Sequence, residues 1–310
     1  MEEHYISKVH PIWDYGMGVF LLIIAILTIL GNSMVLAVAV KRSSCLRSPE
    51  LLTVNLAATD LGMGLSMYPL AIASAWNHAW LGGEATCIYY ALMGFLFGVS
   101  SIMTLSAMAV IRFLVTFSSK PARHKINRKV MHICIMLIWA YAVLWAILPL
   151  LGWGHYGPEP FGTSCTIAWG QFHNSQKGFA FILSMFILCT FLPAITIIMC
   201  YLGIAWKFHK THQEMQNLNR ISSAAKLEKK LILVAVLISV GFLGAWTPYA
   251  IVSFCKTFRH EVKHLRCYSG QRAQENMKNS INSNVSFMWH GGGNICLSTR
   301  QIEMREIPNQ

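Results

Sequence analysis

Six long apolar stretches constrain the fold of this chain more than any other feature of its sequence. Each is long enough to cross the hydrocarbon core of a bilayer, about 30 Å thick, as a helix of roughly 20 residues. The predicted spans cover residues 16–40, 51–76, 88–115, 131–153, 178–206 and 231–255. Hydrophobic residues make up 55% of the 310 residues and charged residues only 12%, which excludes an ordinary soluble domain. We therefore expect an all-α, polytopic transmembrane helix bundle, preceded by an extracellular N-terminus at 1–15.

Lysine and arginine are unevenly distributed among the connections between these spans. The connections 41–50, 116–130 and 207–230 hold three, five and six of them, whereas 77–87 holds none and 154–177 holds one. Basic connections tend to stay in the cytoplasm, so these three are predicted to face inward and the N-terminus outward. The net charge of +12 is then explained by topology and does not indicate a nucleic-acid partner.

Two of the nine cysteines lie on the predicted outer side, where disulfides persist. Cys87 stands at the outer end of the third span and Cys165 in the loop before the fifth. This layout favours a Cys87–Cys165 disulfide over two free thiols. The cysteines within the spans, such as Cys189, are expected to be small buried hydrophobic residues.

Polar residues within the spans are few, and each needs a reason because polar groups are costly in hydrocarbon. Asp60 lies in the middle of the second span, Asn55 near its inner end, and Asn32 interrupts the first span. Asp60 is consistent with a proton relay, an ion site or a structural hydrogen-bond hub, and the sequence alone leaves these open. Arg112 closes the third span, where an anchor at the membrane surface is an equal alternative to a functional role.

The spacing of these residues resembles that of the rhodopsin-like G-protein-coupled receptors. The matching residues are Asn32 after Gly31, Asp60 in the run LAATD, Cys87 with Arg112 twenty-five residues later, Trp139, Pro193 with Tyr201 eight residues on, and the run Trp246-Thr247-Pro248. Each residue alone is a weak signal, but all of them occur at the family spacing over residues 16 to 255. The family implies a bundle of the seven-helix receptor type.

Within that family the chain resembles the opsins, most closely the non-visual neuropsin group. The runs that carry this resemblance are NLAATDLG at 55–62, WGHYGPE at 153–159 and AWTPYAIVSF at 245–254. An opsin is a photoreceptor with a retinal chromophore, 11-cis or all-trans, that signals to a heterotrimeric G protein. By this resemblance the retinal pocket is lined by Tyr90, Gly98, Trp246 and Tyr249.

The resemblance also implies a counter-ion for the imine that opsins form with retinal. Tyr90 matches the position that holds a glutamate in vertebrate visual pigments, so a neutral phenol stands there. Glu159 matches the loop carboxylate that serves in many other opsins. An unpaired buried cation is unstable by several kcal/mol, and Glu159 is the only acidic residue in its loop. The alternative is that Glu159 is a solvated loop carboxylate.

The activation switch of the family departs from its usual form in this chain. The family has an acidic residue, arginine and tyrosine in succession. This chain keeps the arginine as Arg112 but has Ile111 before it and Phe113 after it. Arg112 therefore has no acidic residue before it in the sequence. Glu228, at the inner end of the sixth span, matches the family position that can contact this arginine across the bundle. Tyr201 completes the switch. We expect Glu228→Gln to raise the basal activity of a complete receptor.

The resemblance ends after Phe254. A seventh span with an Asn-Pro-x-x-Tyr turn and a retinal-binding lysine is expected for an opsin, but residues 256–310 contain neither. The composition of this stretch predicts a disordered tail. None of the fourteen lysines lies within a predicted span, and Lys256 is a poor anchor because it lies ten residues past Trp246. We expect a seventh span to be missing, as in an alternative transcript.

Three functions fit these observations. The first is an opsin photoreceptor in the plasma membrane, with lipid and a heterotrimeric G protein as partners. The second is a six-span isoform without covalent retinal, non-signalling or regulatory, which pairs with a full-length relative or another receptor and is retained in the endoplasmic reticulum. The third is a retinal photoisomerase. We favour a receptor over an enzyme, and no metal site is expected.

Overall fold

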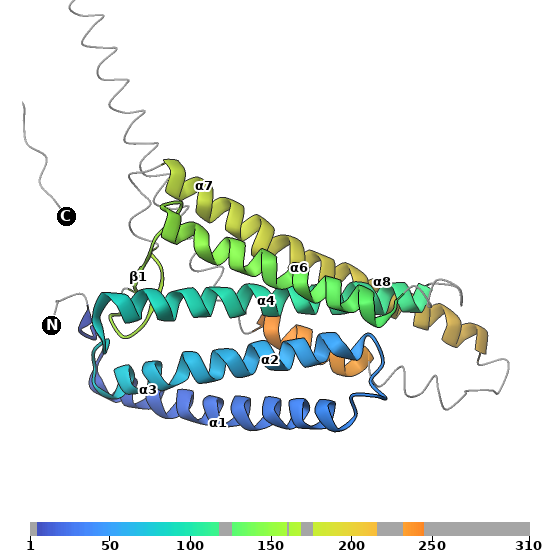
Figure 1. The fold of residues 1–310 in the computed structure, drawn as a ribbon, viewed down its shortest axis with the longest axis horizontal. Helices are drawn as coiled ribbons and strands as arrows, with labels where there is room; N and C mark the ends of the chain where they lie inside the picture. The colour runs from blue at the N-terminus through green and yellow to red at the C-terminus, as the bar shows by residue number, and fades with distance from the viewer. Residues whose placement is uncertain (1–4, 118–125, 160, 169–175, 216–231, 245–310) are drawn as a thin grey trace, which may run out of the picture. The chain divides into compact units, whose positions relative to one another are not determined.

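The computed structural model describes residues 5–117, 126–159, 161–168, 176–215 and 232–244 (Figure 1). All of them belong to one compact unit, Met1–Thr257. The α-helices are α1 (Pro11–Lys41), α2 (Glu50–Ser66), α3 (Tyr68–Trp76), α4 (Gly83–Phe117), α6 (Arg128–Ile147), α7 (Gln176–Met185) and α8 (Leu192–Met215). A further apolar helix covers Ile232–Gly244.

Five helical stretches within the described residues are long and apolar enough to cross a membrane. They are Pro11–Lys41, Glu50–Trp76, Gly83–Phe117, Arg128–Leu151 and Lys177–Phe208. The helix Ile232–Gly244 falls within the predicted sixth span. The predicted transmembrane helix bundle is thus confirmed. The predicted tail, and the place where a seventh span would fall, lie outside the described residues.

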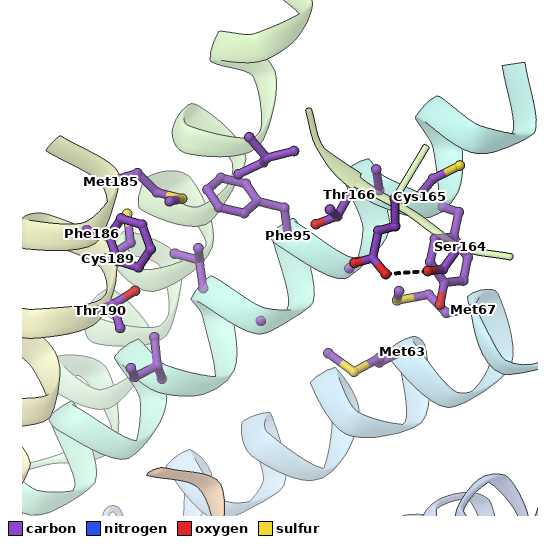
Figure 2. A pocket seen from close by; sticks show the side chains of 18 of the residues that line it. Met63, Met67, Phe95, Ser164, Cys165, Thr166, Met185, Phe186, Cys189 and Thr190 are labelled. Carbon is purple, nitrogen blue, oxygen red and sulfur yellow. Dashed lines mark hydrogen bonds between the residues drawn. The ribbon is translucent and has the colours of Figure 1, made fainter. Parts of the chain in front are cut away.

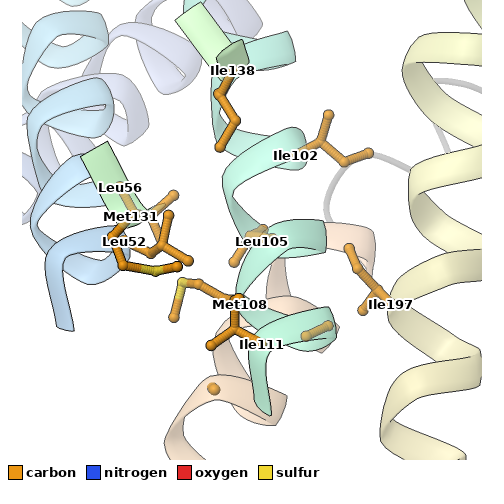
Figure 3. Close-up of a cluster of buried hydrophobic side chains, with 11 residues drawn as sticks. Leu52, Leu56, Ile102, Leu105, Met108, Ile111, Met131, Ile138 and Ile197 are labelled. Atoms are coloured by element: carbon orange, nitrogen blue, oxygen red, sulfur yellow. The ribbon is translucent and has the colours of Figure 1, made fainter. Parts of the chain in front are cut away.

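Helix α4 is the central element of the bundle. It packs against α2, α6 and α8, while α1 packs against α2 and α3 (Figure 1). The buried cluster where these helices meet is made by apolar side chains at helical spacing (Figure 3). Its members include Leu52 and Leu56 of α2, Leu105 and Met108 of α4, Met131 and Ile138 of α6, and Ile197 of α8.

Prolines interrupt three of the predicted spans. The second span is two helices, α2 and α3, separated at Met67, because Pro69 in the first turn of α3 has no N–H to continue the hydrogen bonding. Helix α6 gives way to a 3₁₀ turn at Leu148–Leu151 around Pro149. In the fifth span a π-helical segment, Phe186–Phe191, precedes Pro193 and widens the helix there.

Asn55 joins three helices through its side-chain amide. Its Nδ2 donates to Thr104 Oγ1 on α4 at 2.8 Å, and its Oδ1 accepts from Trp139 Nε1 on α6 at 2.9 Å. The amide of Asn55 thereby has a partner for both its donor and its acceptor. Asn55 therefore has a structural role, because it links α2 to α4 and α6.

The sequence pattern predicts that Asn32 and Asp60 share a polar hub within the membrane, but in the described structure they have separate partners. Ser101 Oγ on α4 donates to Asp60 Oδ1 at 3.3 Å and also lies 3.1 Å from Thr59 Oγ1. Asn32 Nδ2 donates to the Thr28 carbonyl of its own helix at 3.0 Å. The joint role of Asn32 and Asp60 stays a prediction.

Candidate functional site

A short β-hairpin lies between α6 and α7 and carries part of the candidate site. Strand β1 (Tyr156–Pro158) pairs antiparallel with β2 (Cys165–Ile167). The turn between them is closed by Glu159 N–H donating to the Ser164 carbonyl at 2.8 Å. This hairpin was not predicted from the sequence, which identified only an outer loop at that place.

The hairpin is fixed to the bundle by a disulfide between Cys87 of α4 and Cys165 of β2. Their Cα atoms lie 5.3 Å apart, and both residues are almost fully buried. The predicted disulfide is therefore confirmed. It holds the hairpin against the first turns of α4 and so determines where the turn residue Glu159 can lie.

The base of the hairpin is also anchored by Tyr156. Its hydroxyl donates to the carbonyl of Ala146, at the end of α6, at 2.9 Å. Burial raises the pKa of the Tyr156 phenol above its ordinary value. The group therefore stays a neutral donor, and the contact does not depend on pH in the physiological range.

The N-terminal segment covers the disulfide. Trp80 N–H donates to the Tyr5 carbonyl and Ser7 N–H to the His78 carbonyl, each at 2.8 Å. Tyr5 and Trp80 pack with the two cysteines in one buried cluster. Gly162 of the hairpin turn has a φ of +84°, and a Cβ there would lie 2.2 Å from the Ile6 carbonyl oxygen, so only glycine permits this approach.

A cavity of about 370 Å³ lies beneath the hairpin (Figure 2), a volume in the range of small-molecule sites. Its lining residues are Met63, Met67, Tyr90, Ala91, Gly94, Phe95, Gly98, Val99, Ile102, Glu159, Ser164, Cys165, Thr166, Ile167, Met185, Phe186, Cys189, Thr190 and Phe242. Most of the wall is apolar. The only charged side chain among these described residues is Glu159.

Glu159 is half-buried and lines the cavity together with Ser164, which is labelled in Figure 2. Ser164 Oγ donates to Glu159 Oε2 at 2.6 Å, so the hydroxyl orients the carboxylate and stabilises its negative charge. The backbone bond between the same two residues closes the turn. The structure thus places a carboxyl group, oriented by Ser164, on the wall of a mainly apolar cavity.

Tyr90 and Gly98 reach the cavity from α4. Tyr90 follows Cys87 by one helical turn, and its ring lies 5.1 Å from the Trp80 ring in an edge-to-face arrangement. Gly98 lies two turns further along, and a Cβ added there would have no heavy atom within 4 Å. Gly98 therefore leaves open space where a larger residue would narrow the cavity.

The wall opposite α4 is formed by the π-helical segment, which presents Phe186, Cys189 and Thr190 (Figure 2). Tyr141 of α6 donates to the Leu188 carbonyl there at 3.2 Å. This wall was not predicted from the sequence, and neither were Met63 and Met67. The methionines follow helical spacing, but a core position has the same spacing, and nothing in the sequence specified a π-helical register.

The opposite end of α4 holds the predicted switch residues. Ile111, where the family has an acidic residue, is buried in the core between the helices. Arg112 is half-buried and lies within electrostatic range of the Tyr201 phenol. The hydroxyls of Tyr201 and of Ser239 are buried without a hydrogen-bond partner among the described residues.

Three of the predicted site residues, Trp246, Tyr249 and Glu228, lie outside the described residues. The structure brings Tyr90, Gly98 and Glu159 together on one cavity and places Arg112 near Tyr201. The roles assigned to all of these residues stay predictions.

The apolar helices define a membrane protein, and together with the hairpin they enclose a mainly apolar cavity. The family model described as 7 transmembrane receptor (rhodopsin family) matches residues 31–285, a range that continues past Phe254. Opsin-5 of Mus musculus is 40% identical over 259 residues, which are 83% of this chain and 68% of that protein. Opsin-5 of Homo sapiens is 40% identical over 258 residues, 83% of this chain and 72% of that protein.

Among solved structures, that of squid rhodopsin matches with a TM-score of 0.73 and 29% identity, covering 83% of this chain and 77% of that one. The chain therefore belongs to the rhodopsin family of seven-transmembrane receptors and, within that family, to the opsins. The predicted resemblance is confirmed.

Proposed function

We propose that this chain is a light-sensing receptor that binds retinal, 11-cis or all-trans, in the cavity beneath the hairpin and signals to a heterotrimeric G protein. The observation that supports this proposal most is the meeting of Tyr90, Gly98 and Glu159 on one cavity. Tyr90 and Gly98 lie two turns apart on α4, whereas Glu159 comes from the hairpin. All three were assigned to the site from the sequence, through its resemblance to opsins. The relatives that match the chain are named opsins and rhodopsins.

The residues present fit a retinoid. The cavity has apolar walls from α2, α4 and the π-helical segment, as a polyene requires, and Gly98 leaves room beside α4. Met63, Met67 and Phe186 contribute flexible or flat apolar surface. Retinal, when bound, supplies the light absorption and the change in shape that light produces.

Glu159 contributes the one acidic side chain among the described residues that line this cavity. A carboxylate in a region of low dielectric attracts positive charge more strongly than it does in water. Ser164 holds it in place, and the Cys87–Cys165 disulfide fixes the strand that follows. We assign Glu159 the role of counter-ion and Tyr90 that of a neutral neighbour on α4.

Signalling is assigned to the other end of α4. Arg112 and Tyr201 lie there, on the side where the basic connections are predicted to face the cytoplasm. A change of shape in the cavity acts on α4 directly, because α4 lines it. It reaches α8 through the π-helical segment, which lines the cavity and contacts α8.

A second candidate is favoured by the positions of the lysines. No lysine lies in any of the six predicted spans, and none lines the cavity among the described residues. This candidate is a form of the receptor that holds retinal without a covalent bond and is regulatory or non-signalling.

Nucleotide exchange on purified G proteins distinguishes the two candidates. The chain is reconstituted in nanodiscs with 11-cis or all-trans retinal, and exchange is measured in the dark and after a flash. Light-dependent exchange supports the photoreceptor. Bound retinal without light-dependent exchange supports the second candidate, and a folded chain that binds no retinal contradicts both.

A further inference from the structure

Lys207 of α8 links two helices at the end of the bundle where Arg112 lies. Its Nζ donates to the Thr116 carbonyl of α4 at 2.5 Å, although the two residues are 91 positions apart. The same ammonium lies 4.6 Å from the centroid of the Phe117 ring. One side chain of α8 therefore contacts both the backbone and an aromatic face of the last turn of α4.

The last described turn of α4 offers acceptors for such a donor. The final carbonyls of a helix have no N–H partner within the helix and carry partial negative charge. Helix α4 has no basic residue in its last turn. Thr116 Oγ1 donates to the Arg112 carbonyl at 2.7 Å, and Lys207 satisfies the Thr116 carbonyl from the neighbouring helix.

The packing next to Lys207 brings the two helices close. Phe113 and Phe117 stack with ring centroids 4.4 Å apart. Gly203, one turn before Lys207 on α8, faces Phe113, and a Cβ there would lie 2.7 Å from the Phe113 ring. Gly203 and Lys207 thus lie on the same face of α8. Gly203 leaves room for the Phe113 ring, and the Lys207 ammonium lies over the Phe117 ring.

We propose that Lys207 is a positioning residue that ties the end of α4 to α8 and thereby sets the resting activity of the receptor. The proposal rests on the proposed function. Lys207 makes contacts that are lost if the two helix ends separate, so it favours the closed arrangement by the free energy of those contacts.

Hydrogen exchange tests the tie without any G protein. In nanodiscs, Lys207→Met keeps the aliphatic stem and removes the charge, so we expect exchange of the amides at 113–117 to rise about three- to tenfold. Lys207→Arg keeps the charge and should resemble the parent. Lys210→Met removes a charge from an exposed site on the same helix and should leave these amides unchanged. Equal exchange in Lys207→Met and the parent overturns the proposal.

Basal nucleotide exchange tests the consequence for signalling. In the dark, Lys207→Met should raise the basal rate about three- to tenfold, whereas Lys207→Arg should not. A parent that couples, together with a Lys207→Met variant of unchanged basal rate, overturns the proposal. If even the parent shows no exchange after light, the proposed function fails, and the tie is accepted or rejected on the hydrogen exchange alone.

Discussion

Among single residues, Gly98 shows how an absent side chain shapes the candidate site. It lines the cavity with nothing within 4 Å of the place where a Cβ would stand. The resemblance to opsins predicted this position from the sequence, and the structure supplies the physical reason for a glycine there. Glu159 differs from Gly98 in this respect. Its sequence position indicated only a carboxylate in a loop, and the hairpin of the structure shows how that side chain comes to line the cavity.

Filling the space at Gly98 should weaken retinal binding. Gly98→Leu puts a branched side chain into the cavity, and overpacking of about 1–3 kcal/mol corresponds to a roughly ten- to hundredfold weaker affinity. The measurement is a retinal titration followed by quenching of tryptophan fluorescence. Gly241→Leu is the matched control, since Gly241 is exposed and also has open space around its Cβ. Equal affinity in Gly98→Leu and the parent would place retinal elsewhere.

The amide of Asn55 should contribute measurably to stability. Asn55→Ala removes hydrogen bonds to Thr104 and Trp139 and leaves the buried indole N–H of Trp139 unsatisfied, so we expect a loss of about 1–2 kcal/mol. Thermal unfolding in detergent measures it. Asn77→Ala serves as the control, because Asn77 is exposed and bonds only to its own helix. A melting temperature no lower than that of the control would refute the structural role.

At the scale of helices and strands, the sequence predicted the spans better than their irregularities. Runs of apolar residues identify where helices cross a membrane, because length and composition suffice for that. The structure shows interruptions before Pro69, around Pro149 and before Pro193, which the lengths of the apolar runs do not reveal. The π-helical segment and the β-hairpin depend on packing against α4 and α6, which no local pattern in the sequence encodes.

The disulfide should determine the position of the whole hairpin. Cys165→Ser removes a link that closes a loop of 78 residues in sequence, and loss of a native disulfide typically costs about 2–5 kcal/mol. We expect a lower melting temperature and a loss of retinal binding, because Glu159 and Ser164 are carried by the same hairpin. Cys45→Ser, at an exposed free cysteine, controls for the loss of a thiol. Unchanged retinal binding in Cys165→Ser would show that the hairpin is not part of the site.

For the molecule as a whole, the arrangement separates two tasks along α4. One end of this helix contributes Tyr90 and Gly98 to the cavity, and the other end carries Arg112 and the contacts of Thr116 and Phe117 with Lys207. A helix that packs against α2, α6 and α8 can transmit a shift at the cavity to the opposite end, because packed interfaces move between discrete arrangements. Such transmission requires first of all that the cavity bind retinal.

The most direct test is an absorption spectrum of the purified 310-residue chain after incubation with 11-cis or all-trans retinal and removal of the free compound. The account predicts a retinal band that copurifies with the protein in a one-to-one ratio and is reduced in Gly98→Leu. Acid denaturation then shows whether the retinal is covalently attached. A folded protein that retains no band with either isomer would contradict the claim that this cavity is a retinal site.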